Sequence, residues 1–291
     1  MLFKNKVSVR WKEYFDNTCK GEDLWGHYKT SNGDLYVVID GASSHEGTKT
    51  GGDVAQLIDK RLKEDAINIV RSKHLRELLH SINDESVKVN KGAYAAVAGI
   101  LHRGRGMFAF GAGDVSILAK KPNGKLLQTL PLDLSMQRDE AEQTAMTEIG
   151  TIIDGKEITS ENYFKRVNQF LNHGLSNAVG IGESFFLNEK SFYVKDGAAL
   201  LIASDGITDP FMDPQKESGK IPKENALKLY ELINSTNNAE EASEALKDLF
   251  WDTQVKEKKK IKADDRTGIF IYMNVAVAAD DNEKTQILNR E

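Results

Sequence analysis

The stretch Leu35-Tyr36-Val37-Val38-Ile39-Asp40-Gly41 is an apolar run that ends in an acidic residue and a glycine. Such a run is typical of a buried strand that leads into a turn, because aspartate bonds its own backbone and glycine tolerates a positive φ. An acidic residue borders an apolar run at three further places, Asp114, Asp205 and Asp264. Four such positions in one chain are not expected from four unrelated turns. The pattern therefore predicts that these carboxylates form one site.

A metal ion is the partner that this set of residues favours. A carboxylate at the end of a buried strand loses hydration, and divalent cations with oxygen ligands compensate for that loss. No equally placed set of lysine or arginine residues accompanies the four aspartates, which favours a metal over salt bridges. The single cysteine, Cys19, excludes an intramolecular disulfide and a cysteine-based zinc site. We expect Cys19 to be a small buried residue.

The composition narrows the class of protein. The chain has 291 residues, of which 40% are hydrophobic and 29% charged, so it is not disordered throughout. The net charge of −5 argues against nucleic-acid binding, and the lysine-rich run 256–262 is interpreted as a solvated loop. The N-terminus lacks the apolar core of a signal peptide, and no stretch is apolar for long enough to span a bilayer. We therefore expect no membrane contact and a cytoplasmic location.

The hydrophobic periodicity predicts an alternation of strands and helix pairs. Short alternating segments predict an antiparallel meander, helical spacing predicts two helices after Gly52, and four strand-like runs follow. After a polar region come one strand, two helices and a closing strand, an order that predicts an α/β sandwich rather than a βαβ repeat. In chain order, strands are expected near 7–11, 24–28, 35–39, 93–101, 106–110, 115–119, 126–130, 198–203 and 267–273, and helices near 138–147, 162–171, 224–233 and 239–251, besides the pair after Gly52.

Seven short motifs in order along the chain resemble those of the metal-dependent protein phosphatases of type 2C. The resemblance covers nearly the whole chain, from about Val7 to Met273. Two of these motifs are the most specific. One begins at Ser204 and has Asp209 four residues after Asp205, and the other is the closing motif. The motifs are Glu22-Asp23, Asp40-Gly41, Gly113-Asp114, Leu132-Asp133-Leu134-Ser135, Leu175-Ser176-Asn177-Ala178-Val179-Gly180, Ser204-Asp205-Gly206-Ile207-Thr208-Asp209 and Asp264-Asp265-Arg266-Thr267.

This resemblance implies an α+β fold, a four-layer α-β-β-α sandwich of two antiparallel sheets flanked by helix pairs. One phosphatase domain would span residues 1–275, with a flap at about 134–174, and residues 276–291 would form a polar tail. The implied activity is hydrolysis of phosphoserine or phosphothreonine in phosphorylated proteins, among them substrates of a Ser/Thr kinase, by a monomeric enzyme.

The resemblance also implies the ligands of two Mg²⁺ or Mn²⁺ ions. Asp40 would bridge the ions, with Glu22 and the Gly41 carbonyl on one of them and Asp205 and Asp264 on the other. Two such ions lower the pKa of a shared water, so no covalent nucleophile is needed.

Further residues have implied roles around these two ions. Asp23 would orient water, and with Asp40, Asp205 and Asp264 it completes the expected catalytic set. Asp114 and Asp209 match positions that hold a third, weaker ion.

Several positions depart from the family pattern. Thr18 stands where an arginine usually binds the substrate phosphate, so Lys20 or Arg10 is expected to take that role. Asp265 replaces a more common asparagine, and Asn177 stands where an arginine is usual. His45 is a candidate general acid, although a loop histidine without a role is the alternative.

Two other functions remain open. A pseudophosphatase would keep the same sandwich as a partner-binding module with weakened phosphate capture. A phosphatase of small phosphorylated metabolites would use the same chemistry on a different substrate.

Overall fold

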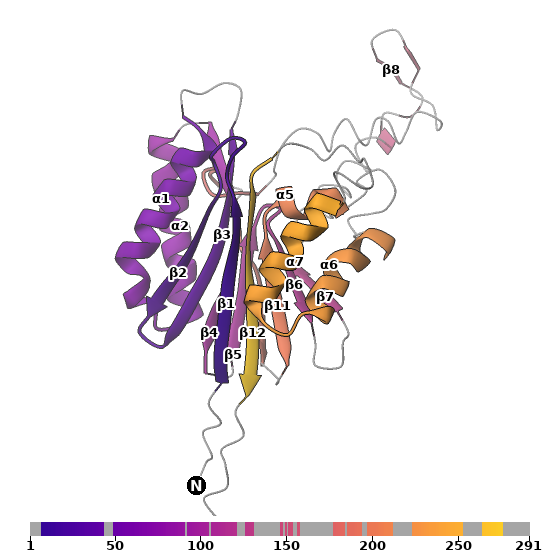
Figure 1. The fold of residues 1–291 in the computed structure, drawn as a ribbon. Coiled ribbons are helices and arrows are strands. Elements are labelled where there is room, and N and C mark those ends of the chain that lie inside the picture. Colours follow the sequence, from indigo (N-terminus) through magenta and orange to yellow (C-terminus); the bar gives the residue numbers. More distant parts are fainter. Residues whose placement is uncertain are drawn as a thin grey trace, which may run out of the picture.

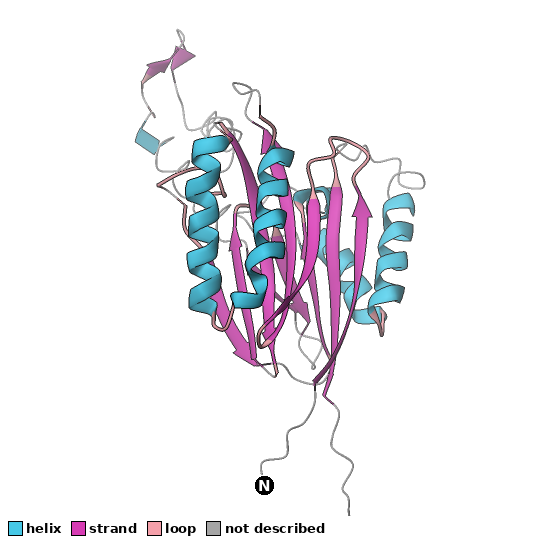
Figure 2. Ribbon diagram, turned by 90° about the vertical axis from the view of Figure 1, so that its left-hand side faces the viewer, coloured by secondary structure: helices cyan, strands magenta, loops and turns pink. Residues whose placement is uncertain are grey.

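Two five-stranded antiparallel sheets pack face to face, and a pair of helices covers each outer face (Figure 1; Figure 2). This arrangement confirms the expected four-layer sandwich. The computed structural model describes residues 7–43, 49–90, 92–104, 106–120, 126–130, 146–147, 149, 151–153, 156–157, 177–183, 185–193, 197–211, 223–252 and 264–275.

The first sheet contains both the earliest and the last strand of the described chain. Its strand order is β1-β12-β11-β6-β7, and every neighbouring pair is antiparallel. The bounds are β1 Val7–Asp16, β12 Arg266–Val275, β11 Ala198–Ala203, β6 Ser116–Lys120 and β7 Leu126–Leu130.

The second sheet has the order β10-β5-β4-β3-β2 and is also antiparallel throughout. A separate two-stranded sheet pairs β8 (Ile152–Ile153) with β9 (Lys156–Glu157). The bounds of the second sheet are β10 Asn188–Tyr193, β5 Gly106–Ala112, β4 Ala93–Arg103, β3 Gly33–Ser43 and β2 Leu24–Thr30.

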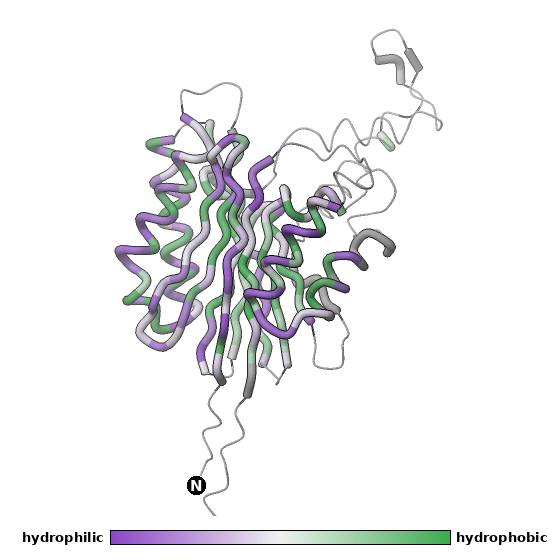
Figure 3. The backbone as a smooth tube through the Cα atoms, viewed as in Figure 1, coloured by the Kyte–Doolittle hydropathy of each residue, from purple (hydrophilic) through white to green (hydrophobic). Residues whose placement is uncertain are grey.

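Side-chain alternation along the strands builds three hydrophobic layers. Figure 3 shows the hydropathy of each residue along the backbone. On β3, Leu35, Val37 and Ile39 pack against α1 (Gly51–Asp65) and α2 (Ser72–Val89). The intervening Tyr36 and Val38 face the other sheet, because successive strand side chains point to opposite faces. The third layer packs the first sheet against α6 (Lys223–Ser235) and α7 (Ala239–Trp251).

Helices α1 and α7 begin where capping side chains satisfy free backbone N–H groups. The Thr50 side chain accepts from the Asp53 N–H, and the Thr50 N–H donates to Asp53 Oδ2 over 2.8 Å, which forms a capping box for α1. Asn238 accepts from the Glu241 N–H over 2.8 Å at the start of α7. Three short helices are α5 (Asp205–Thr208), η1 (Ala66–Asn68) and η2 (Asp209–Phe211).

The predicted meander at the N-terminus is wrong for its first strand. β2 and β3 form a hairpin, but β1 lies in the other sheet, where it pairs with β12 from Asp16 opposite Arg266 to Val7 opposite Val275. The alternating pattern of β1 specifies a strand but not its partner. The expected helix at 162–171 and most of the proposed flap, most of the expected helix at 138–147, and the tail at 276–291 lie outside the described residues.

Candidate metal centre

The acidic residues of the site come from strand ends at one end of the sandwich. Asp40 lies on β3 of the second sheet, two positions beyond Val38 and therefore on the face toward the first sheet. Asp205 begins α5 directly after β11, and Asp264 and Asp265 immediately precede β12. Because β11 pairs with β12 with Ala203 opposite Gly268, these ends lie side by side.

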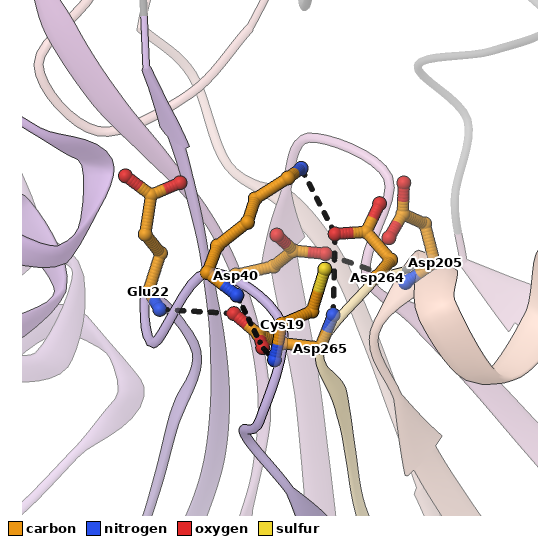
Figure 4. A network of polar contacts seen from close by, with 7 residues as sticks. Cys19, Glu22, Asp40, Asp205, Asp264 and Asp265 are labelled. Carbon is orange, nitrogen blue, oxygen red and sulfur yellow. Dashed lines mark hydrogen bonds and ion pairs between the residues drawn. The ribbon is translucent and has the colours of Figure 1, made fainter. Parts of the chain in front are cut away.

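Asp40 connects the two sheets at this end. The backbone N–H of Asp205 donates to Asp40 Oδ2 over 3.4 Å (Figure 4). Part of Asp40 reaches the surface, but its carboxyl lies deep among protein atoms, and this burial raises its pKa well above the usual range. The neighbouring carboxylates of Asp205, Asp23 and Asp114 raise this pKa further. The site therefore concentrates negative charge that a cation would relieve.

Asp23 is a second buried carboxyl in this group, with 3% of its surface exposed. Burial raises its pKa to about 7, while the Ser204 and Thr267 hydroxyls lower it and the carboxylates of Asp265 and Asp205 raise it. Its Oδ2 atom is buried without a hydrogen-bond partner among the residues that the structure describes. A buried carboxylate oxygen of this kind is suited to bond an ordered water.

Asp265 anchors the loop between β1 and β2. Its Oδ1 accepts from the backbone N–H groups of Cys19 and Lys20, both over 2.9 Å, and its Oδ2 accepts from that of Glu22 over 3.0 Å. Gly21 permits this turn because its φ is +75°, in the left-handed region. Asp265 is 2% exposed. The carboxylate thus sits in a concave row of N–H groups and fixes the position of Glu22.

Lys20 places a positive charge inside the acidic group. Its Nζ lies 2.9 Å from Asp264 Oδ1 (Figure 4). Lys20, one of the two expected phosphate-binding residues, therefore lies beside one of the four aspartates. Cys19 is exposed rather than buried, and its backbone N–H donates to the buried Asp265 carboxylate.

The comparison with protein families shows to which family this chain belongs. A family model described as protein phosphatase 2C matches residues 16–250. The chain belongs to the protein phosphatase 2C family. No protein of curated function shows significant sequence similarity to it.

Several solved structures share this fold at low sequence identity. Stp1 from Staphylococcus aureus, a serine/threonine phosphatase, is 18% identical with a TM-score of 0.63, covering 93% of this chain and 96% of that one. PppA, a regulatory component of the T6SS in Pseudomonas aeruginosa, is 18% identical with a TM-score of 0.60, covering 92% and 100%. The catalytic domain of the phosphatase PstP, solved with two manganese ions, is 17% identical with a TM-score of 0.60, covering 92% and 99%.

The donor atoms of the 2C-type site fit a hard divalent cation. The expected ligands are carboxylates together with the Gly41 carbonyl, and oxygen donors are what Mg²⁺ and Mn²⁺ prefer. Gly41 has no room for a side chain, because an added Cβ would lie 2.6 Å from the carbonyl carbon of Gly51. Within the described chain no three His, Cys, Asp or Glu side chains already enclose a common point. Figure 4 shows that the Glu22 side chain points away from Asp40.

The remaining predicted residues divide between those near the site and those elsewhere. Asp114 follows β5 and lies close enough to raise the pKa of Asp40. Asp209 begins η2, four residues after Asp205. His45 lies outside the described residues.

Arg10 is not part of this site. It lies on β1 opposite Tyr272, six residues before Asp16, at which β1 ends beside the acidic group. At about 3.3 Å per residue, this separation is roughly 20 Å along the strand. Of the two expected phosphate-binding residues, Lys20 therefore lies beside the acidic group and Arg10 lies away from it.

Two departures from the family pattern have local explanations. Thr18 is exposed, and its hydroxyl donates to Asp16 Oδ1 over 2.8 Å. Asn177 is buried and pairs with the backbone of Phe186, donating to its carbonyl over 2.9 Å and accepting from its N–H over 3.1 Å. Asn177 therefore holds a loop rather than facing a substrate.

Sequence reasoning missed the anchoring role of Asp265. The available signal was the alternation of side chains along β12. Ile269 and Ile271 face the other sheet, and Asp265 continues that alternation beyond the strand end. No local signal indicated that its partners lie 243 to 246 residues earlier. Among the described residues, no helix is both long and apolar enough to span a membrane.

Proposed function

We propose that this chain hydrolyses phosphoserine and phosphothreonine in proteins with the help of two Mg²⁺ or Mn²⁺ ions. The observation that carries the proposal is the gathering of Asp40, Asp205 and Asp264 at one end of a 2C-type sandwich, with Asp205 donating to Asp40 from the opposite sheet. PstP, which has the same fold, holds two manganese ions.

Different residues of this chain would bind each of the ions. Asp40 lies between the two sheets and would contact both ions, with Glu22 and the Gly41 carbonyl on one side and Asp205 and Asp264 on the other. When bound, the ions would activate a water and neutralise charge on the phosphate. Asp114 and Asp209 are proposed ligands of a third, weaker ion.

Asp23 and Lys20 would act on the water and the substrate. The buried Asp23 Oδ2 has no hydrogen-bond partner among the described atoms, so it can accept a proton of the attacking water and orient it. Lys20 is the cation nearest to Asp264 in the described ion pairs, and its ammonium would hold the phosphate as a point charge.

Hydrolysis assays with metal-stripped protein test this proposal. We expect turnover of an aryl phosphate and a phosphothreonine peptide with Mn²⁺, and its loss with chelator. Asp40→Asn should abolish turnover, whereas Asp248→Asn, an exposed change on α7, should not. No turnover of any substrate by a protein that binds Mn²⁺ would favour the pseudophosphatase, and turnover of sugar phosphates alone would favour a metabolite phosphatase.

A further inference from the structure

We infer that Lys20 is an internal cation of this site, which holds Asp264 when metal is absent and is displaced toward the substrate phosphate when metal binds. The inference rests on the proposed function and goes beyond it, because it makes a residue of the chain compete with the metal. The motif pattern alone gave Lys20 only a role in phosphate binding.

The ion pair between Lys20 and Asp264 is the first observation that supports this inference. Lys20 Nζ lies 2.9 Å from Asp264 Oδ1, and the Asp264 side chain is 10% exposed while that of Lys20 is 50% exposed. A carboxylate that is largely withdrawn from water needs a compensating positive charge, and Lys20 supplies it. A divalent ion on the same carboxylate would repel the ammonium at this distance, so each cation would weaken the binding of the other to Asp264.

The loop that carries Lys20 explains why the ammonium stays near the site after displacement. The Lys20 N–H donates to Asp265 Oδ1 over 2.9 Å, between the donors Cys19 and Glu22, so the backbone is fixed on both sides. Beyond this anchored backbone, the side chain is a flexible four-carbon stem. The ammonium can therefore leave Asp264 without leaving the mouth of the site.

The exposure of Lys20 makes the exchange feasible. A half-exposed ammonium exchanges protein contacts for water at low cost, and ion pairs with an exposed partner are weak. A metal that binds several carboxylates at once can replace it. Metal binding would then free a positive charge beside the acidic residues. The chain has Thr18 at the position where the family usually has a phosphate-binding arginine.

Metal titration of four proteins tests this role. We would compare the wild-type chain, Lys20→Met, Lys20→Arg and Lys29→Met by calorimetry with Mn²⁺ after metal stripping. Lys29 is the matched control, because its Nζ pairs with Asp34 Oδ1 over 2.5 Å at the opposite end of β3. Circular dichroism of each variant verifies the fold.

We expect Lys20→Met to bind one Mn²⁺ at least about fivefold more tightly, because the competing charge is gone. The same variant should raise KM for an aryl phosphate severalfold with a smaller change in kcat. Lys20→Arg keeps the charge and should resemble the wild-type chain in Mn²⁺ affinity, and Lys29→Met should leave both quantities unchanged.

The outcomes separate this inference from the proposed function. Equal Mn²⁺ affinity of the wild-type chain and Lys20→Met would overturn the competition and leave the metal centre standing. Mn²⁺ binding by neither protein would overturn the metal centre, and with it the competition. Binding by Lys20→Met alone would support the competition and show that the lysine of the wild-type chain excludes the ion.

Discussion

The backbone N–H of Asp205 donates to Oδ2 of Asp40 over 3.4 Å, and this contact joins the two sheets where the acidic residues meet. Asp40 belongs to β3 of one sheet, and Asp205 follows β11 of the other. The candidate metal centre therefore depends on the packing of the sheets against each other. Changes on either side should affect both stability and metal binding.

Asp40→Asn should remove turnover by at least about 100-fold, because one shared ligand of both ions is lost. Burial and three neighbouring carboxylates disfavour a charge at this position, so the neutral amide should also raise the melting temperature in chelator. Activity assays with Mn²⁺ and thermal unfolding with EDTA measure the two effects. Activity within about threefold of the wild-type value would contradict the bridging role.

Asp265→Asn should destabilise the chain by about 2–4 kcal/mol, because an amide offers one acceptor oxygen where the carboxylate accepts from three N–H groups. The Cys19–Glu22 loop should loosen, and Mn²⁺ affinity should fall with it. Denaturant unfolding and calorimetry measure these changes. Asp248→Asn on α7 is the control, and equal stability of the two variants would show that the loop does not need this anchor.

Asp114→Ala should keep two tightly bound Mn²⁺ ions and lose a weaker one, with a clear fall in activity toward phosphopeptides. The expected reason is that Asp114 lies beside Asp40 without belonging to the bridging set. Calorimetric titration resolves strong from weak binding. Loss of the strong phase instead would mean that Asp114 is a ligand of a core ion.

Thr18→Arg should lower KM for an aryl phosphate with a smaller effect on kcat, because a guanidinium would add a contact made equally in the ground and transition states. Arg10→Ala should leave KM unchanged, since Arg10 lies six residues away from the end of β1 at Asp16. Steady-state kinetics measures both variants. A severalfold rise of KM in Arg10→Ala would show that the phosphate lies elsewhere.

His102→Gln should reduce the loss of stability in mild acid. Burial lowers the pKa of the His102 imidazole below the ordinary 6.5, and its Nε2 donates to the Gly104 carbonyl over 2.8 Å. The unfolded chain then binds a proton more readily than the folded one, so stability is full above about 6.5 and falls as pH drops below it. Unfolding between about pH 7 and 5 measures the slope, with the exposed His80→Gln as control. An unchanged slope in His102→Gln would contradict this account.

The sequence by itself determined most elements and the residue types of the site. Period-two alternation predicted β3, and helical spacing predicted α1 and α7, because both patterns are local properties of the chain. It missed β10, whose burial pattern is largely exposed and so carries little apolar signal. The motif order identified the family that the match over residues 16–250 then established.

Only the tertiary structure decided which of these residues meet. The pairing of β1 with β12 joins residues 250 to 268 positions apart, and no local pattern specifies such a partner. That pairing ends at Arg266, directly after Asp265, which holds the loop of Lys20, and it places Arg10 six residues down the strand. The physical reason is that a carboxylate buried at a strand end accepts hydrogen bonds from the donors that the packing of the sheets places near it. The sequence specifies the acidic residues, and the packing of the two sheets determines which groups they contact.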